Sequence, residues 1–383
     1  MKRSYIAKRF QSSGTGLSLD TEALAKYKDI IDLSIGDTDF TTDESIINAA
    51  FRDAKAGHTH YGDPKGDPEL IDAVCRAWEE DFGQRLPRDH VLVSASSCLG
   101  MALVMLAILD PGDEVIAFSP YFPMYREQIE LAGGVCVDVP TYASEDYAID
   151  EARLHAAITP RTKAIVFNNP TNPTGMGYDG KTLELLARVA QEHDLLIAAD
   201  EIYTTYLYEG DFCPIRTLPG MAERTITLNS FSKNFLMTGW RVGVIIAEPE
   251  LLAVMNRVNG SLIYSAPSIS QRAAIQALAM RKEIREKYVT AYRDRIFYAA
   301  DRIEKLPYLS LVRPKGTFYL FPGVEKTGLD EKAFCKVLLD QAHVLVSPGT
   351  PFGVSAAGHF RIACTVGIDQ LKTAFDRMEK LSF

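Results

Sequence analysis

The chain has 383 residues, of which 41 are basic and 50 are acidic, so its formal net charge is −9. This acidic balance argues against nonspecific nucleic-acid binding and against binding to an anionic membrane surface. The longest uncharged apolar run, residues 98–109, is shorter than the ~20 residues that a membrane-spanning helix needs, and it predicts a fully buried helix instead.

The six cysteines are scattered along the sequence, and no two of them form a C-x-x-C pair. This distribution favours reduced thiols in a cytoplasmic protein over a disulfide framework. The seven histidines form no cluster with metal-ligand spacing, so we expect no metal site. The first 16 residues are basic but lack the apolar core of a secretory signal; we expect an N-terminal arm or lid there, with a transit peptide as the alternative.

Short apolar segments alternate with helical patterns through the middle of the chain. The leucine, alanine and valine stripe of residues 181–194 predicts one of the intervening helices. Such alternation is typical of a mostly parallel sheet flanked by helices, so the sequence predicts an α/β fold. We expect strands at residues 114–120, 135–140, 163–170, 195–200, 225–230 and 242–247.

A different region follows this sheet. A long helical pattern over residues 268–306 leads to strand segments at 316–322, 343–349 and 359–365, and then to an amphipathic helix near 368–381. The simplest architecture is a large α/β domain plus a smaller α+β domain built from both chain ends. We assign residues 1–45 to an N-terminal arm and part of the small domain, 46–285 to the large domain and 286–383 to the small C-terminal domain.

Polar and aromatic residues gather at the carboxyl ends of the expected strands, where open parallel sheets bind their ligands. Taken singly, each has a structural reading as a helix cap, a turn or a core side chain. Together they form a complementary set of an amine, a carboxylate, a phenol, an amide, an aromatic face and a serine-lined helix N-terminus. They are Lys233, Asp200, Tyr203, Asn172, Phe122, Ser230, Ser232, Ser96 and Ser97.

This set suits a phosphorylated aromatic aldehyde. The Lys233 amine would condense with the aldehyde, and the Asp200 carboxylate would keep a ring nitrogen protonated so that the ring withdraws electrons. Amide and phenol donors suit a ring oxygen. A helix N-terminus together with the Arg241 guanidinium suits a phosphate.

Five motifs occur in a specific order and spacing: "NNPTNPTG" (168–175), "DEIYTTYLYEG" (200–210), "SFSKNFLMTGWRVG" (230–243), "PKGTFYLFP" (314–322) and "HFRIACT" (359–365). In this order they closely resemble the pyridoxal-phosphate-dependent aminotransferases of class I/II, fold type I. Matches at 33–40, 60–74 and 108–125 extend the resemblance over nearly the whole chain. The resemblance implies a seven-stranded type of sheet, pyridoxal 5'-phosphate as the cofactor and a homodimer with shared active sites.

The resemblance also implies the role of each cofactor-binding residue. Lys233 would form the Schiff base and move the substrate proton, and Asp200 would hold the pyridine nitrogen. Asn172 and Tyr203 would bond the ring oxygen, and Phe122 would stack on the ring. The phosphate would be held by Ser230, Arg241 and the backbone near Ser96, Ser97 and Cys98, although "SASSCLG" (94–100) departs from the usual phosphate loop.

Three further residues are assigned by the resemblance to the substrate and the partner subunit. Arg361 would bind the substrate α-carboxylate, helped by Asn172 and by the backbone at Gly36. Tyr61 would reach across a dimer interface to the neighbouring phosphate. Ser261 stands near the place where aspartate-specialised members carry an arginine, which weakens strict dicarboxylate specificity.

The implied reaction moves an amino group from an L-amino acid to a 2-oxo acid, with 2-oxoglutarate as the expected acceptor, by a ping-pong mechanism. Two alternatives stay open. One is a pyridoxal-phosphate-dependent carbon–sulfur β-lyase of the same fold, because "GDTDF" (36–40) loosely resembles an N-terminal motif of those enzymes. The other is a non-catalytic regulatory domain that senses the cofactor.

Overall fold

The computed structural model describes residues 5–7 and 27–383, so most of the expected N-terminal arm lies outside the described residues. A seven-stranded sheet in the order β2-β8-β7-β6-β5-β3-β4 forms its centre. β8 is antiparallel to both of its neighbours, and the other neighbouring pairs are parallel. The predicted α/β fold with a mostly parallel sheet is confirmed. The strands are β2 (Val91–Ser94), β3 (Glu114–Ser119), β4 (Val135–Pro140), β5 (Thr162–Asn168), β6 (Leu196–Asp200), β7 (Thr225–Ser230) and β8 (Gly243–Ile246).

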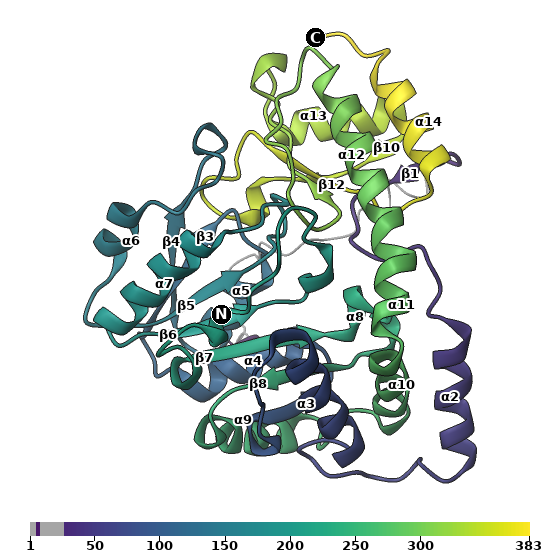
Figure 1. The fold of residues 1–383 in the computed structure, drawn as a ribbon. Coiled ribbons are helices and arrows are strands. Elements are labelled where there is room, and N and C mark those ends of the chain that lie inside the picture. The colour runs from purple at the N-terminus through teal and green to yellow at the C-terminus, as the bar shows by residue number, and fades with distance from the viewer. Residues whose placement is uncertain (1–4, 8–26) are drawn as a thin grey trace.

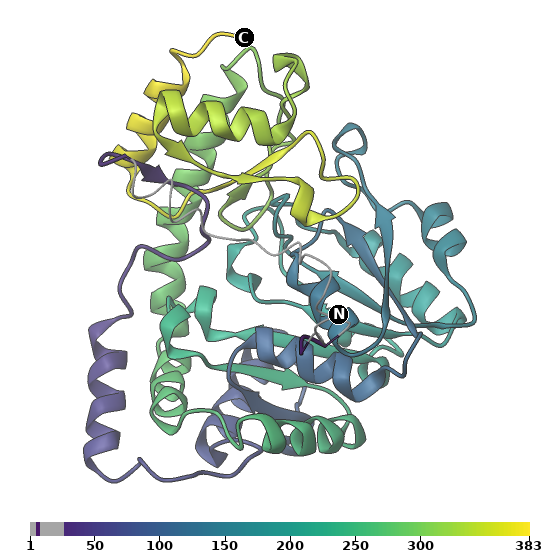
Figure 2. The ribbon, with the colours of Figure 1, turned by 180° about the vertical axis from the view of Figure 1, so that it is seen from behind.

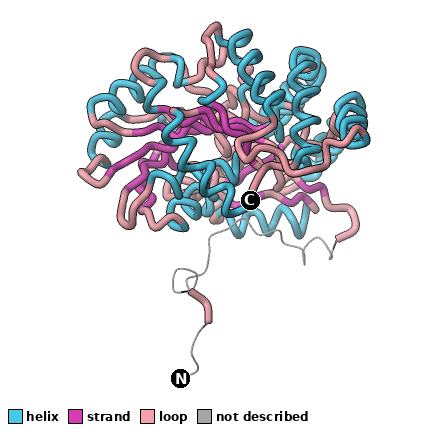
Figure 3. Tube along the Cα trace, turned by 90° about the horizontal axis from the view of Figure 1, so that it is seen from below, coloured by secondary structure: helices cyan, strands magenta, loops and turns pink. Residues whose placement is uncertain are grey.

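Helices cover both faces of this sheet (Figures 1 and 3). One face carries α4 (Ser97–Ile108), α5 (Met124–Leu131) and α9 (Pro249–Leu262). The other carries α3 (Pro68–Phe82), α6 (Glu151–Ala157), α7 (Gly180–Glu192) and α10 (Ser268–Ala279). Successive strand residues point to opposite faces, and both faces are buried here, which explains why the strands read as continuous apolar runs.

A smaller unit packs above the carboxyl edge of the large sheet (Figures 1 and 2). Its two small sheets combine β1 (Ile31–Asp32) with β10 (Val344–Leu345), and β11 (Ser347–Pro348) with β12 (Phe360–Ala363) and β9 (Tyr319–Leu320). Its helices are α12 (Thr290–Glu304), α13 (Glu331–Val337) and α14 (Ile368–Met378). One apolar core joins Ile31 and Leu33 to residues between 296 and 378, so distant parts of the chain build it together.

A column of helical segments connects the two units (Figure 1). It contains α10, α11 (Arg281–Ile284), a π-helical stretch (Arg285–Val289) and α12. The helical pattern predicted over residues 268–306 is therefore confirmed, with an interruption at Met280 that the sequence did not indicate. α2 (Glu44–Lys55) packs against α10 on the outside of the large unit.

The prediction of a fully buried helix at residues 98–109 is wrong in part. α4 buries one side against the strands, α5 and α9, but Cys98 is exposed and Leu106 is 39% exposed. A helix that is apolar all round cannot show which of its sides faces the sheet, so the sequence carried no signal for the exposed side.

Arg272 of α10 links the carboxyl end of α2 to the amino end of α3. Its side chain is only 10% exposed, and it forms ion pairs with Asp53 at 2.7 Å, Asp67 at 3.1 Å and Glu69 at 3.1 Å. The guanidinium compensates the negative charge of carboxylates that are partly buried. Removing it leaves those charges without a partner.

We expect Arg272→Ala to lower the free energy of unfolding by about 3 kcal/mol, because breaking a buried ion pair leaves uncompensated charge. Arg313→Ala is the matched control: Arg313 also pairs with two carboxylates, but it is 46% exposed. We expect that variant to lose less than about 1 kcal/mol. Urea unfolding followed by circular dichroism measures both, and equal losses would contradict the structural role of Arg272.

Candidate active site

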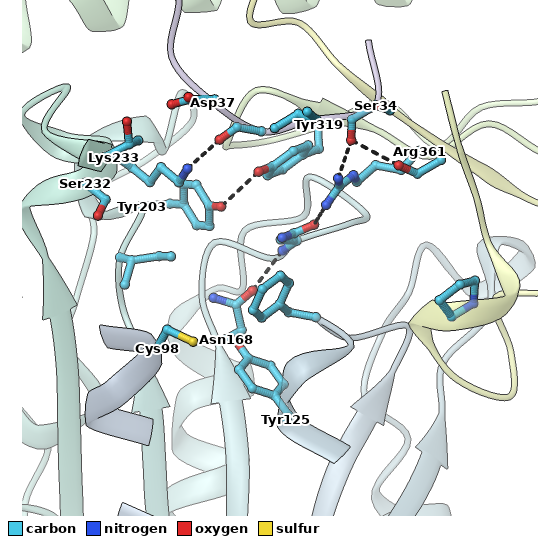
Figure 4. A pocket seen from close by; sticks show the side chains of 18 of the residues that line it. Ser34, Asp37, Cys98, Tyr125, Asn168, Tyr203, Ser232, Lys233, Tyr319 and Arg361 are labelled. Atoms are coloured by element: carbon cyan, nitrogen blue, oxygen red, sulfur yellow. Dashed lines mark hydrogen bonds between the residues drawn. The ribbon is translucent and has the colours of Figure 1, made fainter. Parts of the chain in front are cut away.

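Five strands of the main sheet end at one edge. β2 and β7 are both antiparallel to β8 and so run in the same direction, which β3, β5 and β6 share. The loops that follow these strands line a cavity of ≈ 820 Å³. The small unit supplies the opposite wall (Figure 4). The cavity therefore forms where parallel sheets generally bind ligands.

Lys233 projects into this cavity from α8 (Phe231–Asn234), a single turn that directly follows β7. Its Nζ donates a hydrogen bond to the backbone carbonyl of Gly36, which lies 197 residues earlier in the chain. Burial lowers the pKa of Lys233 to about 8; the carboxylate of Asp37 opposes this shift, and the guanidiniums of Arg361 and Arg241 add to it. With this pKa, about a tenth of the amine is uncharged at pH 7, far more than for an ordinary lysine.

Asp200 stands at the carboxyl end of β6 and is 6% exposed. The Tyr125 hydroxyl donates to its Oδ2, whereas Oδ1 has no hydrogen-bond partner among the described residues. Burial raises the pKa of Asp200 to about 6, and the hydrogen bond from Tyr125 opposes this rise. The carboxylate is ionised at neutral pH with one buried oxygen free, which suits a ligand that carries a cationic N–H group.

Arg361 of β12 supplies the cation at the other end of the cavity. Its Nη1 donates to the Asn172 side-chain oxygen at 3.0 Å, and its Nη2 donates to the carbonyl of Ser34 at 2.6 Å. Its Nε is buried without a partner among the described residues. These two hydrogen bonds fix the guanidinium plane while one donor stays available for an anion.

Tyr203 and Asn172 lie between these charged groups. Tyr203 is buried, and its hydroxyl donates to the hydroxyl of Tyr319 at 3.2 Å. The Asn172 backbone N–H donates to the side chain of Asn168, whose own amide donates to the carbonyl of Asp200. The loops after β5 and β6 are thereby tied to each other. Phe122 lines the same cavity, 5.7 Å from the ring of Tyr125.

The N-terminus of α4 lies at one end of the cavity, where its free backbone N–H groups suit an anion. Ser96 caps this helix with a φ of 95°, and Ser96, Ser97 and Cys98 all line the cavity. A side chain at Gly243 would place Cβ 2.8 Å from the backbone nitrogen of Ser97, so only glycine lets β8 pass this close to the loop. Arg241 faces the same end of the cavity, with Nη1 donating to the carbonyl of Thr238 at 2.7 Å.

The structure places two of the predicted residues outside the cavity wall. Ser230 is buried behind it: its hydroxyl caps α8 by accepting the Ser232 N–H at 3.1 Å and donates to the Ser232 hydroxyl at 2.9 Å. Ser232 lines the cavity in its place. Tyr61 is 87% exposed and packs against Tyr264 at 5.0 Å, away from the cavity of its own chain. The other predicted residues all line one cavity.

Several lining residues were not predicted as site residues, including Tyr125, Tyr319 and Asp37. Tyr125 follows Phe122 by three residues, one helical turn, and this spacing was the available signal. Tyr319 lies in the motif "GTFY", but its neighbours come from the loop after β6 and from β12, and no local pattern shows that approach.

None of the described helices is long and apolar enough to cross a membrane. In residues 5–7 and 27–383, no three or more histidine, cysteine, aspartate or glutamate side chains are grouped so that they could hold a metal ion.

Comparisons with known proteins match nearly the whole chain. The family model described as aminotransferase class I and II matches residues 28–378. An aspartate/prephenate aminotransferase of Thermus thermophilus is 38% identical over 92% of this chain and 91% of its own length. An arginine–pyruvate transaminase of Pseudomonas aeruginosa is 34% identical over 99% and 97% of the two chains. A solved double mutant of the Thermus thermophilus aspartate aminotransferase superposes with a TM-score of 0.94 at 35% identity, covering 99% of this chain and 100% of its own.

The lowered pKa of Lys233 is testable by competitive amine labelling of the ligand-free protein. Only the uncharged amine reacts, so labelling of Lys233 should reach half its maximal rate near pH 8. An ordinary lysine requires a pH of about 10.4. Mass spectrometry of the digest reports every lysine in the same sample, and joint titration of Lys233 with the bulk lysines would disprove its desolvation.

Proposed function

Because this chain belongs to the class I and II aminotransferases, we propose that the cavity around Lys233 is the active site of a pyridoxal-phosphate-dependent amino acid transaminase. The observation that carries this assignment is a set of three groups in one cavity. Lys233 has a lowered pKa, while Asp200 Oδ1 and Arg361 Nε are buried without partners among the described residues. They supply an amine, an acceptor for a ring N–H and a donor for a carboxylate.

The residues present fit the cofactor. The unpartnered Oδ1 of Asp200 would accept the pyridinium N–H, and the faces of Phe122 and the side chains of Asn172 and Tyr203 would contact the ring and its oxygen. The phosphate would bind the helix N-terminus at Ser96, Ser97 and Cys98, the Ser232 hydroxyl and Arg241, with Ser230 orienting Ser232. When bound, the cofactor supplies an electron-withdrawing ring that stabilises negative charge at the carbon carrying the amino group.

The protein groups divide the remaining work. In its uncharged form, Lys233 takes a proton from the substrate α-carbon and can return it, which a lysine of ordinary pKa would do poorly at neutral pH. Asp200, ionised at that pH, keeps a proton on the ring nitrogen. Arg361 holds the α-carboxylate through its free Nε, and the carbonyl of Gly36 accepts a hydrogen bond from an amine at this point.

The substrates are an L-amino acid and a 2-oxo acid, and we infer 2-oxoglutarate as the acceptor. The relatives named above act on amino acids of opposite charge, aspartate and arginine. Their names therefore leave the side chain of the donor open. Arg361, Asn172 and Gly36 contact only the groups shared by all α-amino acids in this assignment.

We propose a homodimer in which Tyr61 completes the site of the partner subunit. Tyr61 is exposed beside Leu262, Ile263 and Tyr264, which are 54%, 39% and 46% exposed. This concentration of exposed apolar side chains supports an interface there. We also retain the cytoplasm as the proposed location, supported by six cysteines that are all free thiols.

The function is tested by borohydride reduction and peptide mapping, followed by product analysis. We expect a covalent pyridoxyl group on Lys233, absent from Lys233→Ala and present in the exposed-lysine control Lys305→Ala. With an amino acid donor and 2-oxoglutarate, the wild-type protein should form glutamate. Pyruvate and ammonia released from cystathionine alone would support the β-lyase instead, and cofactor binding without turnover would support the regulatory domain.

Sharing of active sites is tested by mixing two inactive variants. Tyr61→Ala and Lys233→Ala should each lose most activity as homodimers. After unfolding and refolding together, hybrid dimers contain one site with both wild-type residues, so about a quarter of wild-type activity should return. If Tyr61 served its own chain, the mixture would remain inactive.

A further inference from the structure

One buried tyrosine of the cavity wall has no assigned role. Tyr319 of β9 is 2% exposed and lies opposite Ala363 in the antiparallel pair of β9 and β12. Arg361 is two residues from Ala363 in β12 and therefore shares its face of the sheet with Tyr319. Figure 4 shows Tyr319 between Tyr203 and Arg361 in the cavity wall.

The hydroxyl of Tyr319 accepts the hydrogen bond that the Tyr203 hydroxyl donates. Tyr203 donates to it at 3.2 Å, and both side chains are buried. A phenol has a single proton, so Tyr203 cannot donate to a ligand in the cavity while it donates to Tyr319. The backbone N–H of Tyr319 donates to the Thr317 hydroxyl at 3.1 Å, which helps to fix this strand.

The ring of Tyr319 contacts the guanidinium of Arg361. The central carbon of that group lies 4.6 Å from the Tyr319 ring centroid and 5.0 Å from that of Phe352. Contact of a cation with aromatic faces is strongest where water is excluded, and Arg361 is only 4% exposed. The two rings therefore help to set the plane in which the free Nε points.

The Tyr319 hydroxyl also packs against the backbone at Gly36. A Cβ at Gly36 would lie 1.7 Å from the Tyr319 hydroxyl oxygen, and the carbonyl of Gly36 accepts the hydrogen bond from Lys233. One side chain thus touches the phenol, the guanidinium and the backbone that surround the reacting centre.

We propose that Tyr319 is a positioning residue for transamination: its hydroxyl competes for the proton of Tyr203, and its ring orients Arg361 toward the substrate carboxylate. The inference rests on the proposed function of the cavity. It assigns two separable effects to one side chain. The hydroxyl acts on the cofactor through Tyr203, and the ring acts on the substrate through Arg361.

The hydroxyl effect is measured in the holoenzyme as the pH midpoint of the cofactor's visible absorbance change. Tyr319→Phe frees the Tyr203 proton for the ring oxygen and should lower this midpoint by about half a pH unit or more, because a donated hydrogen bond favours the anionic form. In the Tyr203→Phe background the same change should have no further effect. An unchanged or raised midpoint, or a full shift without Tyr203, overturns the proposal.

The ring effect is measured with L-glutamate as the donor. Tyr319→Leu should raise its KM about tenfold while kcat falls less, because the aromatic contact with Arg361 is lost. Tyr319→Phe keeps the ring and should leave KM within about twofold of wild type. Equal KM changes in the Leu and Phe variants would contradict the role of the Tyr319 ring. If the Leu variant does not fold, the Phe variant still tests the role of the Tyr319 hydroxyl.

Tyr308→Phe is the matched control. Tyr308 is a buried tyrosine of the small unit whose hydroxyl donates to the carbonyl of Met378 at 2.6 Å, outside the cavity. Its loss should affect stability without moving the midpoint or KM. A wild-type protein with no cofactor absorbance would refute the proposed function itself, whereas a normal wild-type titration with an unresponsive Tyr319→Phe refutes only this inference.

Discussion

Withdrawal of the Lys233 amine from water is the constraint on which the site depends, because burial is the largest influence on its charge. A lysine amine in bulk water is protonated at neutral pH. The resulting ammonium group can neither attack a carbonyl nor accept a proton. By excluding water, the cavity makes it easier for the amine to lose its proton. The amine keeps a polar contact, because the carbonyl of Gly36 accepts a hydrogen bond from it. The same low-polarity surroundings raise the pKa of Asp200, which nevertheless remains below neutral pH. Burial therefore favours the uncharged amine, whereas Asp200 stays ionised despite burial, helped by the hydrogen bond from Tyr125.

Closure of this cavity requires parts of the chain that are far apart in sequence. The segment at residues 34–39 forms one wall and is held at both ends by arginines: Arg361 donates to the carbonyl of Ser34, and Arg295 pairs with Asp39 at 2.7 Å. The large sheet contributes the lysine and the carboxylate, while the small unit contributes the guanidinium. The distance between the cofactor-binding and substrate-binding groups therefore depends on how the two units pack against each other.

Much of this arrangement could be read from the sequence, because strand ends in a parallel sheet converge whatever their separation along the chain. This rule brought Lys233, Asp200, Asn172 and Phe122 together correctly. It failed where the direction of a side chain depends on tertiary packing. Ser230 and Ser232 are two residues apart, and only the capping geometry of α8 decides that Ser230 turns inward. Tyr125 and Tyr319 were not predicted as site residues for the same reason, since the hydrogen-bond partner of each comes from another element.

The pairing of β1 with β10 has a consequence for biosynthesis. Ile31 leaves the ribosome long before its partner Val344. The seven-stranded sheet, whose strand β7 directly precedes the turn that carries Lys233, can assemble earlier, since all of its strands lie between residues 91 and 246. Until Val344 emerges, β1 has no partner strand and one wall of the cavity is missing, which is the kind of exposed surface on which molecular chaperones act.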